Sequence, residues 1–400
     1  MTRIGILGGG QLGRMTIEES LKLLCDIEVL SPDDPAPAAG IATRLTVAGL
    51  MDGDAIRALG HRCDVLSYEI EHVDVDALRD VEAAGTPVIP SPAILDIIQD
   101  KAAQKRLLDR AGIPTADWAL IGNGESAATT EAVIEAAARV GGFPVVQKAG
   151  RGGYDGRGVA VLRGPDDARP VAAGGRLLTA PGFVEALVPF TKELAVVVAR
   201  DRAGHTAAWP CVEMIFDPRA NLCDSVLMPA REPPEVLAEA QRVALAVVDA
   251  LGDRARTAGD GAGGAGIFAV ELFLTPDGRV LVNETAPRPH NSGHVTMEAC
   301  ATSQFSQYYR ILAGYPLGSV ELLRPAMMVN RLGEPGAVGE PCYEGLGDAL
   351  GVPGVTVHLY GKSEAKPFRK MGHLTAIGAT AEEAVARAEE ARSRIRITGA

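Results

Sequence analysis

A short apolar run that breaks into glycines stands near the start of the chain and restricts the fold that can follow. Ile4-Gly5-Ile6-Leu7 is typical of a buried strand, and Gly8-Gly9-Gly10-Gln11-Leu12-Gly13 fits the G-x-G-x-x-G turn from strand to helix. Further strand-like runs, each after a helical pattern, lie at 27–30, 65–68 and 87–89. This alternation predicts an open parallel α/β unit over residues 1 to about 95.

The first glycine-rich turn admits three interpretations. Glycines let the backbone approach a ligand, and the N-terminus of the following helix favours anions. A dinucleotide site also needs an acidic residue at the end of the second strand. Here the chain runs Ser31-Pro32-Asp33, with the Asp beyond a proline. A nicotinamide site and a purely structural turn stay open, but we favour a site for a different, phosphorylated substrate.

A second glycine-rich segment lies between strand-like runs at 143–148 and 159–162: Ala149-Gly150-Arg151-Gly152-Gly153-Tyr154-Asp155-Gly156-Arg157-Gly158. It is not a Walker A loop, because no Gly-Lys-Ser/Thr follows. Its backbone amides could wrap a polyphosphate. A lone loop of this kind is as typical of a flexible hairpin, but Lys148 directly before it is placed to meet a phosphate. We therefore interpret the segment as a flap over a nucleotide.

Strand-like runs dominate the chain after Glu193, with helical patterns at 234–251 and 381–394. Residues 259–266, Gly-Asp-Gly-Ala-Gly-Gly-Ala-Gly, are typical of a flexible insert, and we assign them no function. Thr275-Pro276-Asp277-Gly278 is a strong hairpin turn between the strand-like runs on either side of it.

That hairpin could bring Glu271 and Glu284 together at one end. Mg²⁺ takes hard oxygen ligands, commonly one or two carboxylates together with substrate phosphates. Two strand glutamates are more often part of a solvated face, but the apolar neighbours of Glu271 indicate burial. With the Asn283 amide beside them, we predict a magnesium site.

A rigid polar loop follows at 286–294, Ala-Pro-Arg-Pro-His-Asn-Ser-Gly-His. Arg288 could stabilise charge on a transferring phosphoryl group, and His290 could act as an acid or base near neutral pH. Further on, Lys362, Arg369 and Lys370 lie close enough in sequence to bind a phosphate monoester, although alone they are equally typical of a solvated turn.

Length, charge and cysteine content limit the kinds of partner and cofactor that we expect. The length of 400 residues suggests two or three domains, and the net charge of −12 argues against nucleic acid. The six cysteines form no C-x-x-C pair, so neither zinc nor a disulfide framework is indicated, and we expect a reducing cytoplasm. No run approaches the roughly 20 apolar residues of a membrane span.

Taken in this order, the segments resemble ATP-grasp enzymes, most closely the N5-carboxyaminoimidazole ribonucleotide synthetase family of de novo purine biosynthesis. The likeness covers essentially the whole chain. Its most specific segments are Gly-Gly-Gly-Gln-Leu-Gly-Arg-Met at 8–15, Gly-Gly-Tyr-Asp-Gly-Arg-Gly at 152–158, the 286–294 loop, and Thr-Ser-Gln-Phe at 302–305.

The resemblance implies an ATP-grasp fold of α/β and α+β class. A Rossmann-like (pre-ATP-grasp) parallel-sheet domain would span 1–100, a small flap domain 101–190, and a large domain with a C-terminal substrate-phosphate region 191–400. The family uses ATP, Mg²⁺ and bicarbonate to carboxylate aminoimidazole ribonucleotide through carboxyphosphate. A homodimer is also implied.

The resemblance also implies a nucleotide site. Lys101, Lys148 and the flap would bind phosphates, Glu193 the ribose, and Glu271 and Glu284 Mg²⁺. The remaining implied nucleotide contacts are flap residues Gly152, Gly153, Tyr154, Asp155, Gly156, Arg157 and Gly158, hinge residues Glu185, Ala186, Leu187 and Val188, and also Glu213 and Asn283.

On the ribonucleotide side, Gln11, Leu12 and Asn291 would contact the substrate and Glu69 its ribose. Its phosphate would meet Lys362, Arg369 and Lys370. Bicarbonate and the reacting amine would be surrounded by Tyr154, Asp155, Arg157, Arg288 and His290, of which all but Tyr154 are expected to be catalytic.

Two positions depart from the family pattern. Val295 stands where relatives usually have Trp, and Ala149-Gly150-Arg151 before the flap is less typical. At Val295 the chain is similar to a sister family, the formate-dependent glycinamide ribonucleotide transformylases. That family usually has Glu at the position of Gln11 and lacks Gly-Gly-Tyr-Asp-Gly in its flap, so we favour the carboxylating family.

Overall fold

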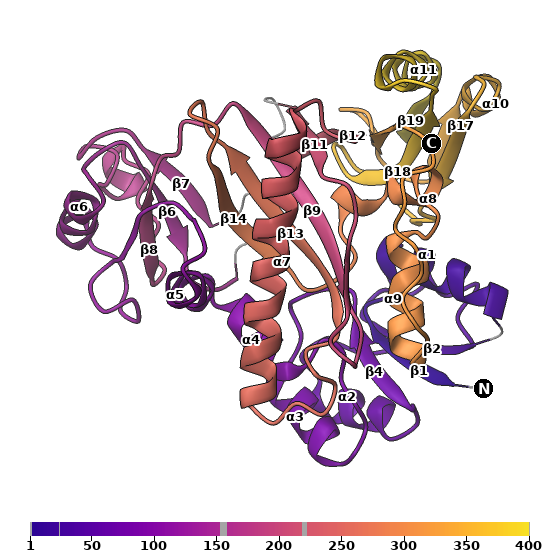
Figure 1. Ribbon diagram of the computed structural model, residues 1–400, viewed down its shortest axis with the longest axis horizontal. Helices are drawn as coiled ribbons and strands as arrows, with labels where there is room; N and C mark the ends of the chain where they lie inside the picture. Colours follow the sequence, from indigo (N-terminus) through magenta and orange to yellow (C-terminus); the bar gives the residue numbers. More distant parts are fainter. Residues whose placement is uncertain (1, 24, 153–157, 218–221, 400) are drawn as a thin grey trace.

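The computed structural model describes residues 2–23, 25–152, 158–217 and 222–399. Its N-terminal part is a four-stranded parallel sheet in the order β3-β2-β1-β4 (Figure 1). Its strands and helices are β1 (Arg3–Leu7), α1 (Gln11–Ser20), η1 (Leu21–Leu23), β2 (Asp26–Ser31), β3 (Arg44–Val47), α2 (Gly53–Gly60), β4 (Val65–Tyr68), α3 (Val75–Ala83) and α4 (Pro92–Gln99). The predicted parallel α/β unit is therefore confirmed.

The strand expected at 87–89 is reduced to a single parallel bridge between Leu66 and Val88. Pro87 and Pro90 lack an N–H on either side of this segment, so a longer ladder has no donors there.

A second lobe contains a four-stranded antiparallel sheet in the order β5-β8-β6-β7. Its elements are α5 (Lys101–Ala111), β5 (Trp118–Leu120), α6 (Thr130–Arg139), β6 (Val145–Ala149), β7 (Val159–Leu162), η2 (Val171–Ala173) and β8 (Gly182–Ala186). Helix α5 ends as its sequence predicts, because Gly112 adopts the left-handed conformation, with φ 64°.

A nine-stranded antiparallel sheet forms the centre of the molecule, in the order β14-β13-β9-β11-β12-β15-β18-β17 with β10 beside β9. Its strands are β9 (Lys192–Arg200), β10 (Thr206–Ala208), β11 (Val212–Asp217), β12 (Leu222–Met228), β13 (Gly266–Leu274), β14 (Val280–Ala286), β15 (Ala326–Leu332), β17 (Val355–Leu359) and β18 (Lys370–Ile377). Helix α7 (Pro234–Thr257) lies across β9 and β13 and is longer than predicted by six residues at its C-terminal end (Figure 1).

The glycine-rich insert at 259–266 is packed, which corrects the expectation of a flexible segment. The Asp260 carboxylate accepts hydrogen bonds from the backbone N–H of Ala262 (2.7 Å) and Gly264 (2.9 Å). Arg200 donates to the Gly263 carbonyl, and Ala262 and Ala265 are buried in the main core. Glycine is needed at 264 because the backbone there packs directly against α7: a Cβ on Gly264 would lie 2.5 Å from the Cα of Gly252.

The C-terminal region completes the large sheet and adds a small one. Helix α11 (Ala381–Arg394), at the predicted position, covers β15 and β18, and the remaining elements are η3 (Asn291–Gly293), α8 (Thr296–Ala299), α9 (Gln304–Ala313), β16 (Pro341–Glu344), α10 (Leu346–Leu350) and β19 (Arg396–Gly399). Strands β16 and β19 pair with each other.

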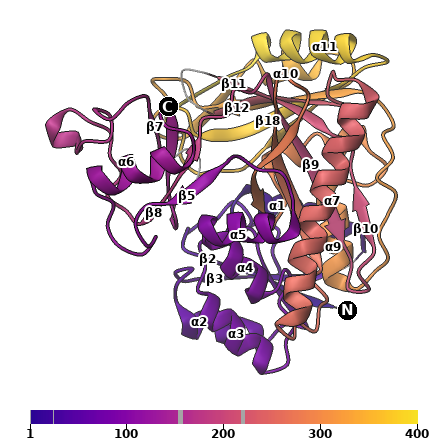
Figure 2. The same cartoon turned by 60° about the vertical axis from the view of Figure 1, so that its left-hand side comes forward.

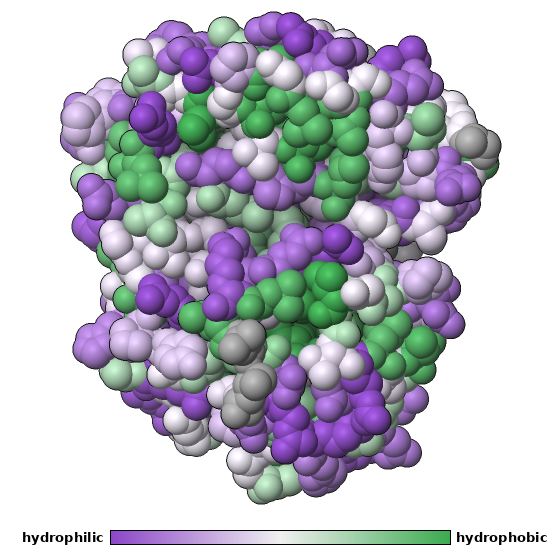
Figure 3. Space-filling model, turned by 90° about the vertical axis from the view of Figure 1, so that its right-hand side faces the viewer, coloured by the Kyte–Doolittle hydropathy of each residue, from purple (hydrophilic) through white to green (hydrophobic). Residues whose placement is uncertain are grey.

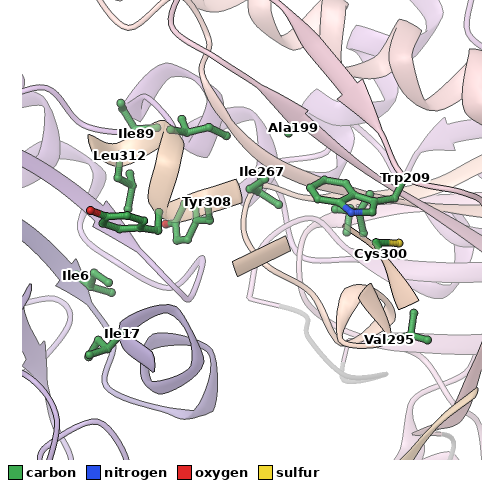
Figure 4. Close-up of a cluster of buried hydrophobic side chains, with 14 of the residues drawn as sticks. Ile6, Ile17, Ile89, Ala199, Trp209, Ile267, Val295, Cys300, Tyr308 and Leu312 are labelled. Carbon is green, nitrogen blue, oxygen red and sulfur yellow. The ribbon is translucent and has the colours of Figure 1, made fainter. Parts of the chain in front are cut away.

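One apolar core joins the N-terminal sheet to the large sheet. Ile6 and Ile17 come from the first unit, Ile267 from β13, and Tyr308 and Leu312 of α9 lie between them (Figure 4). The N-terminal sheet is thereby packed, through α9, against the large sheet. Among the described residues, no helix is both long and apolar enough to cross a membrane.

Candidate active site

The hairpin of β13 and β14 brings the two predicted metal-binding carboxylates together. Thr275 and Gly278 close the turn, with Gly278 at φ 81°, and the register places Glu271 opposite Glu284. The Asn283 Nδ2 lies 3.5 Å from Glu271 Oε2. The predicted convergence of Glu271, Asn283 and Glu284 is therefore present.

Lysines from the flap lobe face this hairpin across a small cleft. Lys101 begins α5 and forms an ion pair with Glu284, while Lys148, at the end of β6, donates to Asn283 Oδ1 at 3.0 Å. The cleft is lined by Lys101, Gln104, Lys105, Leu108, Lys148, Phe183, Asn283 and Glu284. Cations and acids of two lobes thus meet where a metal-bound polyphosphate would lie.

A buried triad supports the floor of the cleft. The Glu185 carboxylate of β8 lies 2.5 Å from Lys148 Nζ and 2.8 Å from Lys105 Nζ. Burial alone would raise the pKa of Glu185, but the two ammonium groups outweigh it and lower that pKa. Glu185 was predicted to meet adenine from a hinge. Its side chain forms ion pairs with Lys148 and Lys105, Leu187 and Val188 lie beyond the strand, and the expected contact of this hinge with adenine stays a prediction.

The pKa values of the two hairpin carboxyl groups are shifted in opposite directions. Burial and the neighbouring carboxylates raise the pKa of Glu271, whereas Lys101 and Lys148 outweigh burial at Glu284 and lower its pKa. A divalent cation between two carboxylates this close would offset their mutual repulsion. Within the described ranges, no cluster of three or more His, Cys, Asp or Glu suits a metal. The donor set of two carboxylates and an amide fits Mg²⁺ that shares phosphate oxygens and water.

Glu193 and Glu213 lie on neighbouring strands β9 and β11. Burial raises the pKa of Glu193 to about 7, a carboxyl suited to hydrogen-bond hydroxyl groups. The Glu213 carboxylate forms ion pairs with Lys192 Nζ at 3.1 Å and with Arg231 Nη2 at 2.8 Å.

The flap prediction falls partly outside the described residues. Gly153, Tyr154, Asp155, Gly156 and Arg157 are not among them, so their expected roles stay predictions. Gly152 and Gly158 border the gap, both in the left-handed conformation, with φ 77° and φ 74°.

Arg288 and His290 follow β14 and point toward two different neighbours. Arg288 Nε lies 2.9 Å from Glu71 Oε1 of the N-terminal unit, and His290 Nε2 lies 3.5 Å from Glu271 Oε1. Burial and the nearby Arg288 cation lower the pKa of His290 to about 3. A lowered pKa favours the neutral ring at pH 7, and the expected acid or base role of His290 stays a prediction.

The neutral His290 ring has a defined tautomer. Its Nδ1 accepts a hydrogen bond from the Ser292 backbone N–H at 3.3 Å, so the proton lies on Nε2, toward Glu271. Asn291 exchanges side-chain hydrogen bonds with Asn330, at 2.9 and 2.8 Å. The polar loop is therefore fixed from both sides.

The first glycine-rich turn holds a carboxylate of the protein itself. Glu69, buried after β4, accepts hydrogen bonds from the backbone N–H groups of Gly10 and Gly13. A Cβ on Gly8, whose φ is 103°, would overlap the Glu69 side chain. The glycines thus make room for Glu69 at the N-terminus of α1, where a dinucleotide would place its pyrophosphate. This argues against the nicotinamide interpretation.

The three C-terminal cations lie near one another, and Lys362 also lies near Glu69. Lys362 Nζ donates to the Lys370 carbonyl at 2.6 Å, and Arg369 donates to the Glu364 carbonyl at 2.8 Å. Burial raises the pKa of Glu69 against the opposing effects of its backbone hydrogen bonds and of the Arg288 and Lys362 charges. Glu69, Arg288 and Lys362 therefore face one another from three segments. Gln11 begins α1 beside them, and Leu12 packs near Tyr360.

Sequence reasoning missed two residues of this arrangement, Lys105 and Glu71. Lys105 lies four residues after Lys101 and so shares its helix face, and Glu71 lies two residues after Glu69. Spacing was a usable signal for Lys105. The contact of Glu71 depends on the packing of two units.

Three family models match the chain in order. They are a ribonucleotide synthetase preATP-grasp domain at 1–99, an ATP-grasp domain at 106–305, and a phosphoribosylaminoimidazole carboxylase C-terminal domain at 326–387. Together with the cleft, this order defines an ATP-grasp ligase. The predicted division at residue 190 lies inside the second match and stays a prediction.

Relatives share the full architecture. The N5-carboxyaminoimidazole ribonucleotide synthetase of Thermotoga maritima is 40% identical, with a TM-score of 0.86 and 100% of both chains covered. The N5-carboxyaminoimidazole synthase of Aspergillus clavatus, in complex with ADP and 5-aminoimidazole ribonucleotide, is 32% identical, with a TM-score of 0.84 and 98% of both chains covered. The chain belongs to the N5-carboxyaminoimidazole ribonucleotide synthase family.

A longer relative, the phosphoribosylaminoimidazole carboxylase of Schizosaccharomyces pombe, is 39% identical over 391 residues, which cover 95% of this chain and 66% of that protein. The chain spans about two thirds of its length. Val295, the position that echoes the sister family, is fully buried in the main core (Figure 4). Its place in the core makes it a packing residue.

Proposed function

We propose that this protein carboxylates 5-aminoimidazole ribonucleotide with ATP and bicarbonate, giving N5-carboxyaminoimidazole ribonucleotide, ADP and phosphate in purine biosynthesis. The observation that carries the proposal is the position of Arg288 and His290. His290 adjoins the Glu271–Glu284 hairpin of the nucleotide cleft, and Arg288 adjoins Glu71 and the Glu69 pocket. A reaction centre thus lies between a nucleotide site and a site for a phosphorylated partner.

The residues divide the work accordingly. Lys101 and Lys148 bind the ATP phosphates, while Glu271 and Glu284 hold Mg²⁺, which when bound offsets charge on the transferring phosphoryl group. Transfer of the γ-phosphoryl group to a bicarbonate oxygen gives ADP and carboxyphosphate. The substrate's exocyclic amine then attacks the carbon of carboxyphosphate, or of the CO₂ it releases. Phosphate leaves, and the amine loses one proton.

Arg288 stabilises the negative charge that develops on the carboxyl oxygens as the amine attacks, and neutral His290 donates its Nε2–H within the site. Glu69 accepts from the ribose hydroxyl groups of the substrate, and Lys362, Arg369 and Lys370 take its phosphate. Glu193 binds the ATP ribose, and Leu187 and Val188, which follow β8, meet adenine. The buried Glu185 holds Lys148 in place for the phosphates.

A homodimer in the cytoplasm completes the proposal. Exposed large apolar side chains include Leu21, Leu23, Tyr315 and Leu323. On the side that carries the N-terminal unit and the C-terminal region, apolar patches stand between polar ones (Figure 3). Such patches suit a subunit interface. Light scattering at several protein concentrations tests the dimer.

The decisive assay follows ADP release with each substrate omitted in turn. We expect turnover that requires aminoimidazole ribonucleotide and bicarbonate together with Mg-ATP. Turnover only with formate and glycinamide ribonucleotide would show that the protein is instead a formate-dependent transformylase. If neither substrate pair gives ADP release, the proposed acceptor is wrong.

A further inference from the structure

Helix α5 carries a second group of cations that the proposed reaction does not use. Lys101 and Lys105 line the nucleotide cleft, whereas Ala103, Arg106 and Arg110 line a separate hollow of about 210 Å³. Residues 103, 106 and 110 are spaced by three and four, so they share one helix face, turned away from the face of Lys101 and Lys105.

The hollow lies where α5 meets α4 and α7, which are neighbours in the fold (Figure 2). Helix α7 contributes Arg254, and the segment before the flap contributes Arg151. The lining contains four arginines and two aspartates, Asp96 and Asp100, an excess of two positive charges. The lining is therefore positively charged, whereas the whole chain has a net charge of −12.

Both aspartates are already engaged. Asp96 lies 3.1 Å from Arg79 and 3.5 Å from Arg151, and Asp100 accepts the N-cap hydrogen bond of α5 from the Ala103 N–H at 3.0 Å. Asp100 also lies 3.7 Å from Arg151. The acids of the hollow therefore balance Arg151 and Arg79.

The other three arginines have no carboxylate within ion-pair distance in the part of the chain that the structure describes: Arg106, Arg110 and Arg254. Arg106 and Arg110 are four residues apart on one face, so their charges repel each other. Helix packing does not explain this convergence, because all three side chains are exposed. An anionic ligand would relieve the repulsion.

We propose that this hollow binds a small anion that carries phosphate groups. Guanidinium groups bind phosphate oxygens through paired N–H donors, and donors from two helices would converge on one ligand. Arg151 lies in the Ala149-Gly150-Arg151 segment that departs from the family pattern. The site is distinct from the nucleotide cleft and independent of the proposed reaction.

Calorimetric titration with pyrophosphate tests the site, with saturating ADP and 5-aminoimidazole ribonucleotide present to fill the nucleotide cleft and the proposed substrate-phosphate site. We expect one binding event that weakens as salt rises, since the arginines are solvent-exposed. The double variant Arg106→Ser/Arg110→Ser should weaken it at least tenfold. The control is Arg44→Ser, which removes an exposed arginine of β3 outside the hollow. Absence of binding to the native protein, or equal binding to all three proteins, would overturn the proposal.

A second set of titrations tests whether the ligand is a free phosphate anion or a nucleotide. Arg254→Ser should also weaken pyrophosphate binding, because its guanidinium comes from a different helix. Titration with AMP under the same conditions separates free phosphate anions from nucleotides. Tighter binding of AMP than pyrophosphate supports a nucleotide ligand, and tighter binding of pyrophosphate supports a free anion. If Arg254→Ser binds pyrophosphate as tightly as the native protein, convergence from two helices is wrong.

Discussion

Arg288 Nε lies 2.9 Å from Glu71 Oε1, in an ion pair that joins the loop after β14 to the segment after β4. The two residues are far apart in the chain, and each follows a strand of a different sheet. The guanidinium expected to act on the reacting carbon is therefore oriented by the N-terminal unit.

We predict that Glu71→Ala lowers kcat about tenfold to a hundredfold, because a misplaced guanidinium loses its alignment with the developing charge. The KM for ATP should change little, since Glu71 lies outside the nucleotide cleft. Steady-state kinetics with each substrate varied checks this. Glu135→Ala, an exposed glutamate of α6, is the control. An unchanged kcat in Glu71→Ala would show that Arg288 is held without it.

The Lys105–Glu185–Lys148 triad predicts a large effect on stability. Glu185→Ala leaves two buried ammonium groups without their carboxylate, which costs about 3–5 kcal/mol for a broken buried pair. We expect urea unfolding at pH 7 to show a loss of that order and ADP affinity to fall as Lys148 moves. Glu135→Ala, on the exposed face of α6, should change the free energy of unfolding by less than about 0.5 kcal/mol.

Gly8 offers a test of the Glu69 pocket. Gly8→Ala combines a positive φ with a Cβ that overlaps Glu69, so the carboxylate must move away from Gly10 and Gly13. We predict a rise of tenfold or more in the KM for the ribonucleotide and a loss of about 1–3 kcal/mol in stability. Gly40→Ala is the matched control, because a Cβ there meets open space. Equal kinetics in the two variants would contradict the role of Glu69.

Much of the fold followed from local patterns. The period of the N-terminal strands, the Thr275–Gly278 turn and the C-terminal helix were readable because each depends on neighbouring residues. The segment at 259–266 was misjudged, because eight small residues carry no apolar period. Its order comes from Asp260 and from the close approach to Gly252 of α7, which no local pattern encodes.

The site divides in the same way. Glu271 and Glu284 were predictable from one hairpin, and Lys148 from the adjacent glycine-rich loop. Glu71, Lys105 and the inward position of Glu185 depend on how separate units pack. The charge state of His290 was also beyond sequence reasoning, because it is set by burial and by the nearby Arg288.

The predicted metal site can be tested at Glu284. Glu284→Gln removes the carboxylate that faces Lys101 and Glu271, so ATP turnover should fall more than a hundredfold. Raising the Mg²⁺ concentration should recover part of the activity if the loss is in metal affinity. ADP release over a magnesium series is the measurement. The control is Glu125→Gln, at an exposed position of the flap lobe, and native turnover in Glu284→Gln would refute the assignment.

Lys362 makes ribonucleotide binding depend on pH. Burial, with the nearby Arg369 and Lys370, lowers its pKa to about 8. Below that pH the ammonium is charged and attracts the substrate phosphate. Above it the amine is neutral, so kcat/KM for the ribonucleotide should fall by up to about tenfold per pH unit. Lys362→Arg keeps its charge and should remove the decline between pH 8 and 10, even if its KM is higher. A decline of the same shape in Lys362→Arg would assign the titration to another group.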